Sequence, residues 1–223
     1  MKVLGVIAAI AIFFAVLVSI DTDKSIADPV KAIVERTNVP NSVTAVYLET
    51  RLYDTVFEVI VFSITAIGVA TLLGSLARTP HENQSVFHSV TVYSGGLAAL
   101  SITLFLYVVL NGHVSPGGGF VGGVVLATGV VTYGLTSDFK RASSHYDRLR
   151  IKQLESASLL VIFALSTLIM LFPGMHSRLL ASGTFGSTLS GGLIPILNIL
   201  VGIKVYAGAW KMSGEFISRR GTL

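Results

Sequence analysis

The sequence predicts an all-α polytopic membrane protein with six transmembrane helices, arranged as two plus four. The first observation is a series of apolar runs close to the length that a helix needs to cross a bilayer core of about 30 Å. These runs occupy residues 3–20, 51–76, 86–110, 120–135, 156–172 and 193–212. The second observation is the composition, since 52% of the 223 residues are hydrophobic and 13% are charged. That is too little charge to cover the surface of a soluble domain of this size.

The distribution of basic residues predicts the orientation. Ten of the 16 lysines and arginines lie on one side of the expected spans, five of them in the expected basic loop 136–155, and five lie on the other side. The positive-inside rule then places both termini in the cytoplasm and the segment 21–51 outside. We expect a multi-pass protein of the plasma membrane. Because the basic residues lie beside membrane spans, the net charge of +4 does not indicate a nucleic-acid partner.

The residue types present exclude several kinds of chemistry. There is no cysteine, which excludes iron–sulfur clusters, thiolate zinc sites and disulfides. The five histidines show no pairing at helical spacing on one helix, so we expect no metal site. We expect no cofactor and no catalytic residues, so the chain is not predicted to be an enzyme.

The N-terminal segments are punctuated by charge and proline. Residues 3–20 follow Lys2, and a signal peptide is the alternative interpretation, but Leu17 and Ser19 do not form an Ala-x-Ala-like cleavage site. We therefore expect an uncleaved first transmembrane helix. A short helix is expected at 32–36. A short extended segment is expected at 42–48, where β-branched residues partly alternate.

The second span carries an unusual stripe of charge. Arg51, Asp54 and Glu58 lie three and four residues apart, so they share one helix face, which continues to Thr65. A carboxylate facing lipid costs about 2.5–3.5 kcal/mol, so this face must meet protein or water. Arg51 and Asp54 also fit an interfacial pair that anchors the helix end. Glu58 lies about 10 Å further along the helix than Arg51, which favours a place on an ion path.

A glycine-rich turn separates the third and fourth spans. Residues 111–123 read Asn-Gly-His-Val-Ser-Pro-Gly-Gly-Gly-Phe-Val-Gly-Gly. Ser115 and Pro116 are suited to opening a helix, and Pro116 and Phe120 are then expected on one face of it. Gly118/Gly122 and Gly119/Gly123 form two overlapping Gly-x-x-x-Gly pairs, which predict close helix packing and an assembly surface for partners. The packing and turn residues are Ser115, Pro116, Gly117, Gly118, Gly119, Phe120, Gly122 and Gly123.

Two further titratable residues are candidates for the ion path. His113 lies just before the turn, and we expect it to shape the turn, with proton transfer as the alternative. Lys204 lies in the middle of the sixth span, about 10–13 Å from its nearer end, too deep to reach the interface comfortably. It therefore needs a carboxylate, a carbonyl or water, either for structure or as part of a relay. Asn198 lies on another face and is expected to form an interhelical hydrogen bond.

The turn residues also carry a family resemblance. His-x-Ser-Pro-Gly-Gly-Gly-Phe-x-Gly-Gly, from His113 to Gly123, resembles the signature of the MnhB/MrpB family, which supplies one subunit of the Mrp-type multisubunit Na⁺/H⁺ antiporters. The resemblance covers about residues 85–215. Similar subunits occur in the membrane arms of archaeal membrane-bound hydrogenases and sulfane reductases.

A second resemblance covers the N-terminal part. The pattern Arg-x-x-Asp-Thr-x-x-Glu, here Arg51, Asp54, Thr55 and Glu58, is similar to the C-terminal end of MrpA, the large subunit of the same antiporters. The family pattern usually has a glycine where this chain has Val56-Phe57. The two resemblances imply a two-helix part at 1–80 joined to a four-helix part at 81–223.

The resemblances imply a non-catalytic membrane subunit of a cation/proton-translocating complex. The parent complex would be an Mrp antiporter or the Mrp-like module of an archaeal respiratory hydrogenase or sulfur-reductase complex. The implied partners are homologues of MrpA, MrpC, MrpD, MrpE, MrpF and MrpG, hydrogenase-like or sulfane reductase subunits, and membrane lipid. A purely structural assembly subunit without an ion path is the alternative. An independent small transporter is a third hypothesis, but no inverted repeat is visible.

Overall fold

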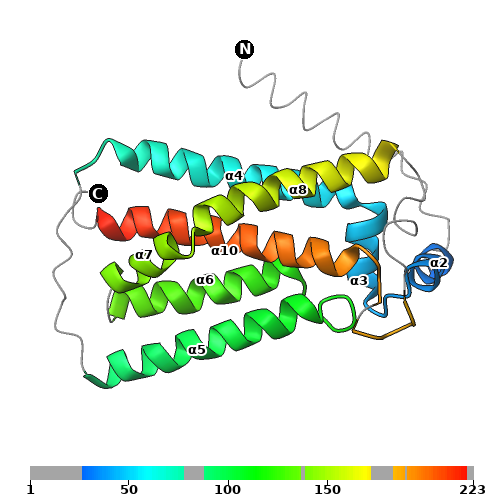
Figure 1. Ribbon diagram of the computed structural model, residues 1–223, viewed down its shortest axis with the longest axis horizontal. Helices are drawn as coiled ribbons and strands as arrows, with labels where there is room; N and C mark the ends of the chain where they lie inside the picture. The colour runs from blue at the N-terminus through cyan, green and yellow to red at the C-terminus, as the bar shows by residue number, and fades with distance from the viewer. Residues whose placement is uncertain (1–26, 78–87, 137–138, 172–182, 189, 220–223) are drawn as a thin grey trace, which may run out of the picture.

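The chain folds into a bundle of helices, as a computed structural model shows for residues 27–77, 88–136, 139–171, 183–188 and 190–219 (Figure 1). All regular elements in these ranges are helical. They are α2 (Ala27–Thr37), α3 (Ser42–Ala45), the π-helix η1 (Val46–Thr50), α4 (Leu52–Gly74), α5 (His88–Leu110), α6 (Gly119–Thr136), α7 (Phe139–Arg148), α8 (Ile151–Leu171) and α10 (Ile194–Ser218).

Five of the described helices are long and apolar enough to cross a membrane. They are α4, α5, α6, α8 and α10, and they confirm the second to sixth predicted spans. The predicted first span at 3–20 lies outside the described residues. Many large apolar side chains on α4 and α5, such as Leu72 and Tyr93, are exposed on the isolated chain, which suits contact with lipid or partner helices.

Helix α10 lies at the centre of the bundle. It contacts α4, α5, α6 and α8, and it buries more of its residues than any other described span (Figure 1). Helices α4, α6 and α10 run in one direction, and α5 and α8 run in the other. The turn between α5 and α6, the segment α3–η1 and the start of α10 therefore lie at one end of the bundle. Helix α7 and the end of α10 lie at the opposite end.

Two predictions about local structure are wrong. Residues 42–48 are helical and not extended, because Asn41 caps α3: its side-chain oxygen accepts a hydrogen bond from the Thr44 amide at 3.3 Å. The segment 136–155 is not a loop throughout, because α7 occupies much of it and α8 begins at Ile151. Ala142 and Ile151 are buried there, so the polar helix α7 and the start of α8 pack on the bundle through a few apolar residues. The short helix expected at 32–36 is confirmed within α2.

The glycine-rich turn is longer than predicted. Helix α6 begins at Gly119, so Ser115 and Pro116 lie before it, and Pro116 does not share a helix face with Phe120. Gly117 and Gly118 have φ angles of 145° and 123°, which side-chain-bearing residues rarely adopt. The α-helix starts only after these two glycines because their backbone conformation is not helical.

The glycines at the start of α6 pack against helices of the same chain. A Cβ atom on Gly123 would lie 2.6 Å from the carbonyl oxygen of Gly202 in α10, and one on Gly122 would lie 2.5 Å from a methyl of Val109 in α5. The predicted close approach of helices is confirmed. The partner helices, however, are α5 and α10, so the assembly surface expected at Gly118 and Gly122 is covered within the chain.

Gly123→Ala is expected to destabilise the fold by about 1–3 kcal/mol, because the new methyl would overlap the α10 backbone. Gly68→Ala is the matched control, since no atom lies within 4 Å of its added Cβ and alanine is the better helix former. The thermal unfolding midpoint in detergent should fall for Gly123→Ala and hold or rise for Gly68→Ala. Equal midpoints would mean that α6 and α10 do not rely on this contact.

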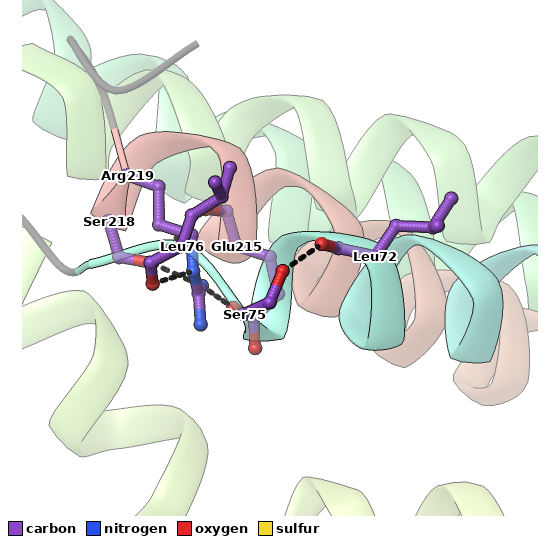
Figure 2. Close-up of polar contacts among 6 residues, drawn as sticks. All are labelled: Leu72, Ser75, Leu76, Glu215, Ser218 and Arg219. Carbon is purple, nitrogen blue, oxygen red and sulfur yellow. Dashed lines mark hydrogen bonds and ion pairs between the residues drawn. The ribbon is translucent and has the colours of Figure 1, made fainter.

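The N-terminal and C-terminal parts are joined along α4. Its first half packs on α8 and α10, where Val56, Val59, Ile162, Val201 and Val205 form one buried apolar cluster. At the far end, the Arg219 guanidinium donates a hydrogen bond to the Leu76 carbonyl at 3.2 Å and pairs with Glu215 (Figure 2). Ser75 also donates a hydrogen bond to Leu72 at this end. The two parts therefore share a core.

Candidate functional site

The charged stripe of α4 lines a groove on the outer face of the bundle. This groove, which we call the Glu58 groove, has a volume of about 700 Å³. Its lining residues are Arg51, Asp54, Phe57, Glu58, Val61, Phe62, Thr65 and Phe120. The prediction that the four polar residues from Arg51 to Thr65 share one helix face is confirmed. Helix α4 presents this face outward because its opposite face, including Val56 and Val59, packs in the core.

The three charges of the stripe differ in their partners. Arg51 and Asp54 form an ion pair, and both side chains are exposed to a large extent. Glu58 is exposed and has no hydrogen bond or ion pair with any part of the chain that the structure describes. It lies six residues into α4, about 9 Å from the helix start. A carboxylate at that depth in a membrane span needs a partner protein or water.

The Glu58 groove also receives a residue from the glycine-rich turn. Phe120, in the first turn of α6, is half exposed and contacts Phe62 of α4 edge-to-face with ring centroids 6.0 Å apart. The Phe120 ring therefore forms one wall of the groove that holds Glu58. The turn and the charged stripe, which are distant in the sequence, thus lie at the same site.

Lys204 lies deep in the bundle and has a carboxylate partner. Its side chain is almost fully buried on α10, and its ammonium group pairs with Glu155 on α8. The prediction that Lys204 needs a polar partner at this depth is confirmed. Glu58 is not that partner, so the two deep charges do not neutralise each other.

Glu155 is a functional candidate that the sequence interpretation misses. The apolar run of the fifth span starts at Ser156, so the sequence pattern places Glu155 in the preceding loop. Helix α8 instead starts at Ile151, and Ile151, Ser158 and Ile162 follow each other on its buried face. Glu155 lies between them at helical spacing, which is the signal that predicts an inward-facing carboxylate.

Hydrogen bonds from Asn41 hold the glycine-rich turn. Its side-chain amide donates to the carbonyls of Gly112 and Ser115, each at 2.8 Å, and its backbone amide donates to the His113 carbonyl at 3.1 Å. The Thr44 hydroxyl donates to the Gly112 carbonyl as well. The segment before α4 is therefore bound directly to the turn between α5 and α6.

Asn198 of α10 connects the same two regions. Its side-chain oxygen accepts hydrogen bonds from the Tyr47 hydroxyl at 3.3 Å and from the Gly119 amide at 3.1 Å, which confirms it as an interhelical hydrogen bonder. Burial raises the pKa of Tyr47, its bond with Thr44 opposes the rise, and the charge of Glu58 adds to it. Tyr47 therefore stays protonated near neutral pH, and the negative charge of Glu58 favours that neutral form.

His113 is completely buried within the turn. Its Nε2 atom lies 3.3 Å from the Ser187 carbonyl oxygen, and its backbone carbonyl accepts from Asn41. The Nδ1 atom is buried and has no hydrogen-bond partner among the described residues. His113 thus joins the turn to the loop before α10, and it is not among the residues that line the Glu58 groove.

His113→Gln is expected to lower the thermal unfolding midpoint in detergent. The change alters a buried polar contact, which is worth about 1–3 kcal/mol when a group is left unsatisfied. Thermal unfolding of the wild type and the variant in the same detergent measures the effect. An unchanged midpoint would mean that the turn does not rely on this contact.

The fold and these sites define a class: an all-helical polytopic membrane protein with ionisable side chains in the hydrophobic region. Residues 89–211, more than half of the chain, match the family described as "domain related to MnhB subunit of Na+/H+ antiporter". The chain belongs to this family.

Two similar proteins extend the match beyond the family domain. The uncharacterized protein MJ1307 of Methanocaldococcus jannaschii is 27% identical over 199 residues, covering 76% of this chain and 74% of its own. A chain in the structure of the membrane-bound sulfane sulfur reductase (MBS), an archaeal respiratory membrane complex, is 25% identical with a TM-score of 0.72. That likeness covers 97% of both chains.

Proposed function

We propose that the chain is a non-catalytic membrane subunit of a multisubunit complex that translocates Na⁺ or H⁺, with Glu58 on the ion path. The observation that carries the proposal is a carboxylate without a partner in the described chain, about 9 Å into a membrane span and facing out of the bundle. Burying such a group against lipid is costly, so a water-filled path or a partner helix must meet it. A carboxylate at such a position binds and releases cations or protons.

The parent complex is proposed to be a redox-driven respiratory complex rather than a standalone antiporter. The likeness to a chain of the sulfane sulfur reductase complex extends over nearly the whole of both chains, and so includes α2 to α4 as well as the family domain. This supports one polypeptide that joins a two-helix part at 1–80 to a four-helix part at 81–223. Its partners are then homologues of the other Mrp-type subunits together with sulfane reductase or hydrogenase-like subunits.

The Glu58 groove is proposed as the place where the partner completes the path. Arg51 and Asp54 neutralise each other at the entrance, while Glu58 and Thr65 continue inward along α4. The Lys204–Glu155 pair is a second charged site within the bundle, and its ion-conducting role is part of the proposal. The basic end of the bundle, with α7 and the end of α10, is proposed to face the cytoplasm.

The test uses membranes of cells that lack this chain and are complemented with it. Sodium-dependent proton transport in everted vesicles should disappear without the chain and return with it, and a tagged chain should co-purify with antiporter-like and redox subunits. The isolated chain, reconstituted alone, should show no coupled exchange. Robust exchange by the isolated chain would identify an independent transporter. Full transport by vesicles carrying Glu58→Gln would favour a purely structural subunit.

A further inference from the structure

A second groove lies beside the α7–α8 corner, separate from the Glu58 groove. It has a volume of about 500 Å³, within the range of about 300–1,000 Å³ typical of small-molecule sites. Its walls come from α5, α6, α7, α8 and α10, and we call it the corner groove. The inner part is apolar, with Ile102 and Phe105 from α5, Leu126 from α6 and Ile203 from α10.

The outer end of the corner groove is polar. His145 and Tyr146 of α7 line it, and the Tyr146 hydroxyl oxygen is buried without a hydrogen-bond partner among the described residues. Burial raises the pKa of Tyr146, chiefly by desolvation and further through Glu155, so the hydroxyl remains a donor at neutral pH. A buried O–H without an acceptor is costly, so a ligand oxygen that this donor reaches when its ring turns toward the groove is favoured.

Basic residues flank two of the residues that line this outer end. Arg148, Arg150 and Lys152 are exposed and alternate with Leu149 and Ile151, which line the groove. The described segment 139–152 carries five lysines and arginines against one acid, Asp147. Basic residues at the membrane surface attract anionic headgroups, by about 1 kcal/mol for each lysine or arginine.

We propose that the corner groove binds an anionic membrane phospholipid. One hydrocarbon chain lies in the apolar part between α5, α6 and α10. The phosphate lies at the corner beside Arg148, Arg150 and Lys152, and the Tyr146 ring turns so that its hydroxyl donates to a headgroup or glycerol oxygen. A phospholipid matches both features of the groove, its apolar interior and its cationic mouth. An apolar protein helix or a free phosphate would match only one of them. The site is present whether or not Glu58 carries ions.

Trp210 provides an intrinsic reporter for this site. It is the only tryptophan in the chain, and its ring lies 6.1 Å from that of Tyr146, centroid to centroid. Trp210 does not itself line the corner groove, but a brominated hydrocarbon chain that passes Tyr146 would come close enough to quench its fluorescence. The full chain is placed in phosphatidylcholine nanodiscs that contain increasing fractions of brominated phosphatidylglycerol, or of brominated phosphatidylcholine as the neutral comparison. Half-maximal quenching is expected at a mole fraction roughly tenfold lower for the anionic lipid.

Two comparisons between variants connect the quenching to the groove. Ala98→Phe places a ring in the groove, while Ala99→Phe places the same ring on the exposed face of α5 outside the groove lining. Arg148→Gln combined with Lys152→Gln removes two positive charges at the mouth of the corner groove. Lys140→Gln removes one positive charge near the start of α7. Ala98→Phe should abolish the high-affinity quenching, and the charge double variant should remove the preference for phosphatidylglycerol. The controls should quench like the wild type.

Several results would overturn the proposal. Equal quenching by the two lipids would identify ordinary boundary lipid, and unchanged quenching in Ala98→Phe would place the lipid elsewhere. Absence of quenching by either lipid would show that the groove is closed to lipid. Ala98→Phe is checked for folding by its helical circular dichroism and elution volume. The charge double variant changes only exposed residues and so tests the site even if Ala98→Phe does not fold.

Discussion

Glu58→Gln in the assembled complex is expected to lower sodium-dependent transport about tenfold to a hundredfold. An interaction with a charged group contributes about 1.5–3 kcal/mol, and an amide at this position loses that contribution for a passing cation. Assembly should be unchanged, because the Glu58 side chain makes no described contact within the chain that the amide would break. Transport is measured in vesicles with a fully assembled complex, quantified by subunit stoichiometry.

Asp54→Asn is the matched comparison for this experiment. Asp54 lies on the same helix face but nearer the start of α4, and Arg51 already neutralises it, so a smaller loss is expected. Glu35→Gln, on exposed α2, controls for the loss of a carboxylate that lies outside the groove. Normal transport in Glu58→Gln, with assembly intact, would remove this residue from the mechanism.

Lys204→Met is expected to destabilise the folded chain by about 3–5 kcal/mol, because it leaves the Glu155 carboxylate buried without its counter-ion. Glu155→Leu should have a similar effect, because it leaves the buried ammonium group of Lys204 without its counter-ion. The double variant should recover most of the loss, since a buried ion pair is often no more stabilising than apolar side chains of similar volume. Unfolding midpoints in detergent for the two single variants and the double variant measure the coupling.

Lys211→Met is the control, because this lysine lies two turns further along α10 and has no described ion pair. Single and double variants with additive effects would show that Lys204 and Glu155 do not depend on each other. If the double variant folds normally but lacks transport, the pair belongs to the ion path. A double variant that folds and transports normally would assign it a structural role alone.

Several features of this protein could be predicted from the sequence because they depend on local periodicity and composition. Apolar runs of bilayer length predict spans wherever they occur, and five of them are present as α4, α5, α6, α8 and α10. Helical spacing alone places Arg51, Asp54 and Glu58 on one face, since neighbours three and four residues apart share a face in any α-helix. The depth of Lys204 likewise required a polar partner, whatever that partner was.

Tertiary packing alone decided the identities of the partners. Glu155 pairs with Lys204, and Phe120 forms a wall of the Glu58 groove, because helices far apart in the sequence lie side by side around α10. The helix at 42–45 forms against its β-branched composition because Asn41 caps it and the turn at Gly112 accepts its Thr44 hydroxyl. Glycine spacing predicts that helices approach closely, but which helix approaches depends on long-range contacts that no short sequence pattern encodes. The pairing of α6 with α5 and α10 is therefore a property of the whole bundle.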